Sequence, residues 1–398
     1  MYITKNITAA HTAGKRGASS DFIRCVCAVI CLSILSCKTT DPASSAKKYE
    51  PVSGTITAVE KYGHLVTDVP FDLMQQRGDE HGDIVKVDFK NTYRFTAPIV
   101  KRYEVDKGKQ LVRTEYADGK ITFCINYGNL AQESKIGVGD TFTLYMQEKG
   151  GYANDFEALD VTRTDKRSDY SDDATFANFR EVTFGSAISP ALLYRGSHPT
   201  KTRWPRAPYA STLMEKAGIV TVINMSDSED QLKNTYLAAS NEYASAYYGK
   251  LADAGDVIYL AMGMDFTSKT FTDNIIKALQ FMLGHQPPYY IHCNEGKDRT
   301  GFIFILLGAL TGADEKAIYD DYMKSYENFY HVVPGSKKYD LILQKNALPM
   351  LSWITMNRND RVQAAEAFLI KNGMPKKDVE ALKAKLKATR ASFKNSRF

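Results

Sequence analysis

The fold of this chain is decided by residues 291–301, which read IHCNEGKDRTG. A short apolar run, YYIH at 289–292, leads into this stretch, and a second apolar run, TGFIFILLGAL, begins at Thr300. The pattern predicts a strand, a tight loop and a buried helix, because the second run is apolar on nearly every helical face. Cys293 therefore falls in a loop at the N-terminus of a helix.

The residues around Cys293 are those that bind an anion. Backbone N–H groups that converge at a helix N-terminus attract anions, and cysteines in such positions ionise more readily than free cysteine. Arg299 follows six positions later, so its guanidinium can meet two oxygens of a tetrahedral anion held by the loop. Gly296 suits a position with positive φ or close backbone approach. These residues predict a nucleophilic thiolate in a phosphate-binding loop.

Read as HCxxGxxRTG, the stretch from His292 to Gly301 resembles the active-site signature of the protein tyrosine phosphatase superfamily, HCx5R followed by serine or threonine. The loop sequence GKDRTG is most similar to the loops of bacterial tyrosine phosphatases and of the phosphoinositide phosphatases that share this type of loop. LLYRGSHP at 192–199 also resembles a segment near the start of the bacterial family. The resemblance covers about residues 176–345 and leaves the N-terminal part of the chain unassigned.

The resemblance implies a phosphomonoester hydrolase that forms a cysteinyl-phosphate intermediate and needs no metal or other cofactor. Cys293 would be the nucleophile, Arg299 would bind the phosphate, Thr300 would help the sulfur to leave, and His292 would orient the loop. The residues expected to bind phosphate are Asn294, Glu295, Gly296, Lys297, Asp298 and Arg299.

The implied substrate is phosphotyrosine, and a phosphoinositide or inositol polyphosphate is the alternative. Lys297 favours the polyphosphorylated substrate because it adds a cation to the loop, whereas the negative charge of Glu295 opposes it. A different hypothesis is a phosphate-binding module that has lost turnover. The joint presence of Cys293, Arg299 and Thr300 argues against it.

The family also implies a general acid that protonates the leaving oxygen. Asp265 is the preferred candidate, because it ends the strand-like stretch VIYLAMGMD before the signature, and Asp298 inside the loop is its rival. The remaining candidates are Asp227, Asp253 and Asp256. Arg195 either reaches the site or pairs with a carboxylate.

The rest of the chain predicts two folded domains. Residues 52–165 alternate apolar and polar side chains with a period of two, which predicts a small all-β domain, a barrel or a sandwich. A polar stretch at about 165–175 reads as a linker. Residues 170–398 alternate strand-like and helix-like runs, which predicts an α/β phosphatase domain with a largely parallel sheet covered by helices.

The N-terminus resembles a bacterial lipoprotein signal. Residues 1–36 combine basic residues with an apolar run that is short for a membrane span, and ILSC, ending at Cys37, resembles a lipobox. The prediction is an exported protein, anchored in a membrane by acyl chains on Cys37, with residues 37–51 as a tether.

Charge and cysteine content exclude other classes. The net charge of +5 is spread along 398 residues without a long basic block, so no nucleic acid partner is expected. Four of the six cysteines lie at or before Cys37, and only Cys124 and Cys293 remain. Neither a disulfide framework nor a metal site is indicated.

Overall fold

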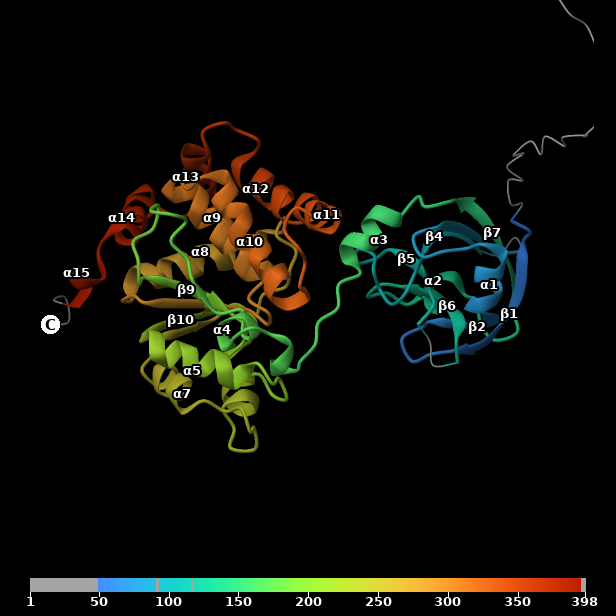
Figure 1. Ribbon diagram of the computed structural model, residues 1–398, viewed down its shortest axis with the longest axis horizontal. Helices are drawn as coiled ribbons and strands as arrows, with labels where there is room; N and C mark the ends of the chain where they lie inside the picture. Colours follow the sequence, from blue (N-terminus) through green and yellow to red (C-terminus); the bar gives the residue numbers. More distant parts are fainter. Residues whose placement is uncertain (1–48, 91–92, 116–117, 395–398) are drawn as a thin grey trace, which may run out of the picture. The chain divides into compact units, whose positions relative to one another are not determined.

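The computed structural model describes residues 49–90, 93–115 and 118–394 (Figure 1). The expected signal peptide, Cys37 and most of the expected tether lie outside the described residues. No helix in the described ranges is both long enough and apolar enough to cross a membrane.

The first described part of the chain is a closed barrel, with the strand order β1-β2-β6-β5-β4-β3-β7. The barrel strands are β1 (Val52–Val59), β2 (Leu65–Pro70), β3 (Ile84–Phe89), β4 (Tyr93–Val100), β5 (Gln110–Arg113), β6 (Lys120–Ile125) and β7 (Thr141–Glu148). Three short helices accompany them: α1 (Phe71–Arg77), α2 (Leu130–Ser134) and α3 (Ala153–Leu159). The predicted small all-β domain is confirmed, and it is a barrel.

The alternating residues produce the barrel core. In β3, the side chains of Val85, Val87 and Phe89 are buried while those between them are partly exposed. Phe123 and Phe142 meet edge to face at 4.8 Å between ring centroids. Cys124 lies on the opposite phase of its strand and is also fully buried, and burial raises the pKa of its thiol to about 12. Cys124 is therefore an inert packing residue.

The second part is built on a five-stranded sheet with the order β11-β10-β12-β9-β8. Its strands are β8 (Arg180–Glu181), β9 (Leu193–Gly196), β10 (Thr221–Asn224), β11 (Val257–Tyr259) and β12 (Tyr289–His292). All neighbouring pairs are parallel except β8 with β9. The predicted, largely parallel sheet is confirmed.

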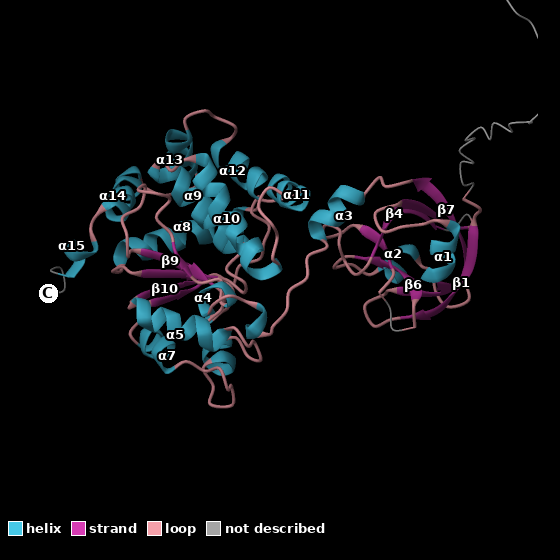
Figure 2. Ribbon diagram, in the orientation of Figure 1, coloured by secondary structure: helices cyan, strands magenta, loops and turns pink. Residues whose placement is uncertain are grey.

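Helices cover both faces of this sheet (Figure 2). The helical segments of this part are α4 (Asp173–Phe176), α5 (Ala207–Ala217), α6 (Glu229–Gln231), α7 (Ala246–Asp253), α8 (Lys269–Gly284), α9 (Asp298–Thr311), α10 (Glu315–Tyr330), α11 (Lys337–Lys345), α12 (Ala347–Thr355), α13 (Arg361–Lys371), α14 (Lys376–Lys387) and α15 (Arg390–Lys394). Val222 and Tyr290 pack with α5 and α7 on one face. Ile223 and Ile291 pack with α8 and α9 on the other. This alternation follows from the strand period of two.

Helix α9 is the central helix of the second part. Every residue from Thr300 to Thr311 is buried, as its continuous apolar composition predicts. Because α9 follows β12 after only five residues, the loop between them is held between a central strand and a buried helix. This arrangement gives the loop a rigid support on both sides.

The polar stretch before α4 packs onto the second part. We call residues 161–170 the linker segment. Arg206, which is fully buried, donates to the Tyr170 hydroxyl at 2.7 Å and to the carbonyls of Thr164 and Phe176. Its guanidinium also lies 4.5 Å from the Phe329 ring centroid. The Tyr170 hydroxyl shares its proton between the carbonyls of Thr164, at 2.8 Å, and Phe329, at 3.2 Å, so the linker segment is anchored by buried contacts.

Candidate active site

The signature loop, residues 293–297, runs from the end of β12 to the first turn of α9. Gly296 has a φ of +68°, and a Cβ at this position would lie 2.0 Å from the carbonyl oxygen of Gly196 at the end of β9. Only glycine fits such an approach. The predicted reason for a glycine here is confirmed, and it fixes the loop against the neighbouring strand.

Donors outside the loop occupy its carbonyl groups. The backbone N–H of His198 donates to the Asn294 carbonyl at 2.8 Å, and the Asn178 side chain donates to the Glu295 carbonyl at 2.9 Å. Arg195 donates to the Gly296 carbonyl at 2.7 Å and also pairs with Asp321. Arg195 was expected either to reach the site or to pair with a carboxylate, and the structure shows the pairing with a carboxylate. The same side chain also supports the signature loop through its carbonyl groups.

The N–H groups of the loop have no such partners. Those of residues 294–297 donate no hydrogen bond to any described residue. Together with the N-terminus of α9, they form a set of donors without acceptors, as expected of an anion-binding loop.

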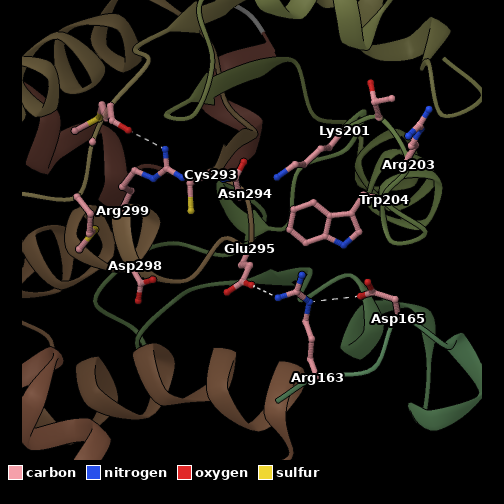
Figure 3. Close-up of a pocket in the computed structure, with 14 residues that line it drawn as sticks. Arg163, Asp165, Lys201, Arg203, Trp204, Cys293, Asn294, Glu295, Asp298 and Arg299 are labelled. Atoms are coloured by element: carbon pink, nitrogen blue, oxygen red, sulfur yellow. Dashed lines mark hydrogen bonds and ion pairs between the residues drawn. The ribbon is translucent and has the colours of Figure 1, made fainter. Parts of the chain in front are cut away.

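A pocket of about 550 Å³ opens over this loop (Figure 3). The signature contributes Cys293, Asn294, Glu295, Asp298 and Arg299 to its lining. The other walls are made by Arg163, Asp165, Lys201, Thr202, Arg203, Trp204, Met262, Gly263 and Met264. The predicted nucleophile and the predicted phosphate-binding arginine therefore share one pocket.

Backbone carbonyls hold the Arg299 side chain in this pocket. Its Nη1 donates to the Met262 carbonyl at 2.8 Å and, at 3.4 Å, to that of Met225. Its Nε and Nη2 donate to no described residue, so two donors remain for two oxygens of a bound anion.

His292 lies behind the loop, buried, and not in the pocket. Its Nδ1 contacts the Cys293 carbonyl at 3.1 Å, and its Nε2 lies 3.1 Å from the Tyr248 hydroxyl. Burial, and next the charge of His198, lower the pKa of His292 to about 3. The ring is therefore neutral at physiological pH, which suits an orienting role and not proton transfer.

Thr300 is also buried, in the first turn of α9. Its hydroxyl has no hydrogen-bond partner among the described residues. The expected hydrogen bond to the Cys293 sulfur thus stays a prediction, but the hydroxyl is free to make it.

The two preferred acid candidates differ in position. Asp265 is exposed and does not line the pocket, and its carboxylate accepts from the hydroxyl of Thr267 at 2.7 Å and from its N–H at 3.1 Å. These hydrogen bonds lower the pKa of Asp265. Asp298 lines the pocket and accepts from the Tyr322 hydroxyl at 3.1 Å.

The remaining acid candidates lie elsewhere. Asp227 is buried and accepts a hydrogen bond of 2.6 Å from His198 Nε2. Asp253 ends α7, and Asp256 lies just before β11. None of these three carboxylates lines the pocket.

Two loop residues expected to bind phosphate contribute no side chain to the lining of the pocket. Lys297 is buried, with its ammonium 4.5 Å from the Tyr326 ring centroid and 4.8 Å from that of Tyr330. Gly296 contacts β9. They support the loop, and neither lines the pocket.

Sequence reasoning missed three residues of the opposite wall, Lys201, Trp204 and Arg163. Lys201 and Trp204 come shortly after LLYRGSHP at 192–199, the second segment that resembles the bacterial family. Their closeness to that segment could have pointed to the site. Arg163 precedes Glu295 by 132 positions, and nothing in its local sequence points to the site.

A comparison with family models identifies the family of this chain. A model of the tyrosine phosphatase family matches residues 174–388, which is more than half of the chain. The chain therefore belongs to the tyrosine phosphatase family, and the family predicted from the signature is confirmed. No curated protein matches the sequence.

Similar solved structures include three proteins. An uncharacterized conserved protein from Thermotoga maritima is 27% identical, with a TM-score of 0.23, and the match covers 24% of this chain and 35% of that one. The core catalytic domain of the PP-IP phosphatase Siw14 from S. cerevisiae is 19% identical over 46% of this chain and 93% of that one, with a TM-score of 0.26. TpbA from P. aeruginosa, in complex with pTyr, is 15% identical over 42% and 94%, with a TM-score of 0.24.

Proposed function

We propose that this protein hydrolyses phosphomonoesters through a cysteinyl-phosphate intermediate on Cys293. The observation that carries the proposal is that Cys293 and the free donors of Arg299 line one pocket, above a loop whose N–H groups at 294–297 have no partner in the described part of the chain. This arrangement suits a thiolate nucleophile and a phosphoryl group that is held for attack.

The reaction proceeds in two displacements. The Cys293 sulfur attacks phosphorus, the bond from phosphorus to the ester oxygen breaks, and a general acid protonates that oxygen as it leaves. Water then attacks phosphorus and gives a proton to the carboxylate that acted as the acid in the first step, the sulfur leaves, and inorganic phosphate is released. Arg299 and the loop N–H groups hold the phosphoryl oxygens through both steps. The Thr300 hydroxyl is available to donate to the departing sulfur.

Asp298 is the acid that the geometry supports better. It lines the pocket, whereas Asp265 is exposed and already accepts two hydrogen bonds from Thr267. Asp265 could act only after its loop moved toward the pocket, where Gly263 and Met264 already contribute to the wall.

Phosphotyrosine is the first substrate class to test, because the chain belongs to the tyrosine phosphatase family. The second candidate is an inositol phosphate, which the cationic residues of the opposite wall favour. We also propose that the protein is exported and anchored to a membrane by acyl chains on Cys37, on the basis of its lipobox-like sequence.

Trapping of the intermediate tests the mechanism. With ³²P-labelled aryl phosphate and rapid acid quench, the wild-type protein should retain label, and Cys293→Ser should retain none and lose turnover. Cys124→Ala is the matched control, because it removes the other described cysteine from a buried position in the barrel, and it should retain label. Arg299→Lys should lose most turnover, since an ammonium cannot replace the bidentate fork.

Two results would refute this mechanism. One is label bound to the Cys293→Ser variant. The other is wild-type activity that is lost in EDTA and restored by zinc or magnesium.

A further inference from the structure

Lys297, the lysine of the signature loop, is already engaged by other side chains of the protein. The ammonium of Lys297 lies under Tyr326 and Tyr330 and is 3.4 Å from the Glu295 carboxylate. Because Lys297 does not line the pocket, its position gives no support to a role in binding a second phosphate.

The negative charge of Glu295 is likewise compensated. Arg163 Nη1 donates to Glu295 Oε1 at 2.6 Å, and the Tyr330 hydroxyl donates to Oε2 at 2.8 Å. Burial acts to raise the pKa of Glu295, but the charges of Lys297 and Arg163 outweigh it and lower that pKa. Glu295 is thus an ionised, paired carboxylate, and the electrostatic objection to a multiply phosphorylated substrate is largely removed.

Lys201, on the opposite wall, is one cation left for a ligand, and Arg203 lines the same pocket. Its ammonium lies 4.6 Å from the Trp204 ring centroid, and it forms no ion pair with any described carboxylate. Figure 3 shows the Lys201 ammonium pointing toward the loop that carries Cys293 and Asn294. The Arg163 guanidinium lies over the same indole, 5.5 Å from its ring centroid.

The electrostatics of Lys201 favour an additional anion. Burial is the main cause that lowers the pKa of Lys201, and the positive charges of Arg163 and Arg299 act in the same direction, against Asp227 and Glu295. A bound anion next to the ammonium would relieve this cost.

Two nearby polar groups have no hydrogen-bond partner among the described residues. Trp204 is 6% exposed, and its Nε1–H has no hydrogen-bond partner among the described residues. The hydroxyl of Thr202, on the same loop, is also buried without a partner. Both groups are enclosed by the protein, so the donors that line the pocket are the Lys201 ammonium and the Arg163 guanidinium, and these match a ligand rich in acceptor oxygens.

We propose that Lys201, Trp204 and Arg163 form a second anion subsite, which binds a second phosphate on the same substrate molecule. The inference rests on the proposed function, since the first phosphate must occupy the signature loop. A polyol bisphosphate supplies both groups, whereas a peptide with a single phosphotyrosine leaves the second subsite empty. Arg163 comes from the linker segment, outside the residues that the family model matches, so the subsite is not provided by the family domain alone.

The test compares substrates that differ by one phosphate. For the full-length wild-type protein, kcat/KM is measured on an inositol bisphosphate and on an inositol monophosphate, each as the free headgroup and as a short-chain phosphatidylinositol. The bisphosphate should be preferred by roughly tenfold or more, the size expected of one charge-assisted hydrogen bond. In Lys201→Met this ratio should fall toward one, and Lys201→Arg should restore part of it. A preference for the bisphosphate over the monophosphate supports the subsite, whether it is seen with the free headgroups or with the lipids. The pair that shows the preference tells whether the ligand is a soluble inositol phosphate or a lipid headgroup.

The matched control is Lys316→Met, on α10, because Lys316 has an exposed side chain and its ion-pair partner is Asp320 of the same helix. It should keep the wild-type ratio. A wild-type ratio near one, a ratio that Lys201→Met leaves unchanged, or faster turnover of a phosphotyrosine peptide than of every bisphosphate would overturn the subsite. Activity on p-nitrophenyl phosphate distinguishes this failure from that of the proposed function, because wild-type protein inactive on all substrates would refute the function itself.

Discussion

Arg163 of the linker segment and Glu295 of the signature loop form an ion pair of 2.6 Å across 132 positions of sequence. The pair brings a residue from outside the matched family region to the candidate active site. Arg206 fixes the linker segment through buried hydrogen bonds to Tyr170 and to two carbonyls, so Arg163 is held in place from behind.

The first prediction concerns this ion pair. Arg163→Gln should lower kcat/KM on p-nitrophenyl phosphate by roughly tenfold, because it leaves the half-buried Glu295 carboxylate undercompensated beside an anionic substrate. Glu295→Gln in the same protein should restore part of the loss, with a coupling energy of about 1–2 kcal/mol in the double-mutant cycle.

Arg167→Gln is the control for Arg163. Arg167 lies in the same linker segment, but it pairs with Asp173 and does not line the pocket. Additive effects of the Arg163 and Glu295 substitutions would show that the ion pair does not position the loop.

The second prediction separates the two acids. An activated phenol leaves almost unaided, whereas a tyrosyl oxygen must be protonated, so removal of the acid should affect phosphotyrosine far more than p-nitrophenyl phosphate. Asp298→Asn should reduce kcat on phosphotyrosine by roughly 10²- to 10⁴-fold, with a smaller loss on the activated ester. The alkaline limb of its pH profile should disappear.

Asp265→Asn serves as the comparison in that experiment, and we expect small changes on both substrates. If the leaving-group dependence followed Asp265 instead, the exposed loop that carries it would have to close over the pocket during catalysis.

The third prediction concerns pH and His292. The folded-state pKa of about 3 lies below the ordinary value of 6.5, so the unfolded chain binds this proton at a higher pH than the folded chain does. The free energy of unfolding should therefore fall as the pH drops below about 6.5, and this residue should contribute about 2 kcal/mol of that loss by pH 5.

Urea unfolding of the wild type and of His292→Gln between pH 7.5 and pH 5 checks this sign. The variant should show a shallower dependence on pH, although His198, whose pKa burial also lowers, keeps part of the slope. Parallel curves would mean that His292 takes up its proton equally in both states.

The fourth prediction concerns the membrane anchor. Cys37→Ala should abolish incorporation of labelled palmitate and release the protein from the membrane fraction, because anchoring would rest on acyl chains attached to that residue. Unchanged membrane association without label would favour an uncleaved apolar anchor instead.

The sequence by itself determined the two kinds of fold and the position of the candidate nucleophile. Period-two alternation was enough to predict an all-β domain, because one face of each strand must be buried, whereas the choice between a barrel and a sandwich came from the structure. The run after Thr300 was apolar on all sides and predicted a buried helix, and the spacing of Cys293 and Arg299 placed both at one loop. Each of these features depends on residues that are close together in the sequence, so a local pattern of residue types is enough to predict it.

Only the tertiary structure decided what surrounds that loop. The general-acid candidates could not be ranked by spacing, since what matters is which carboxylate reaches the pocket, and Asp298 does while Asp265 does not. In the sequence, Lys297 favoured a multiply phosphorylated substrate and Glu295 opposed one. In the structure, Lys297 is buried under tyrosines and Glu295 is paired with Arg163, so neither residue acts on the substrate as the sequence suggested. Arg163 lies 132 positions before Glu295, and the two tyrosines that cover Lys297 lie about 30 positions after it, so only the folded chain brings these groups into contact.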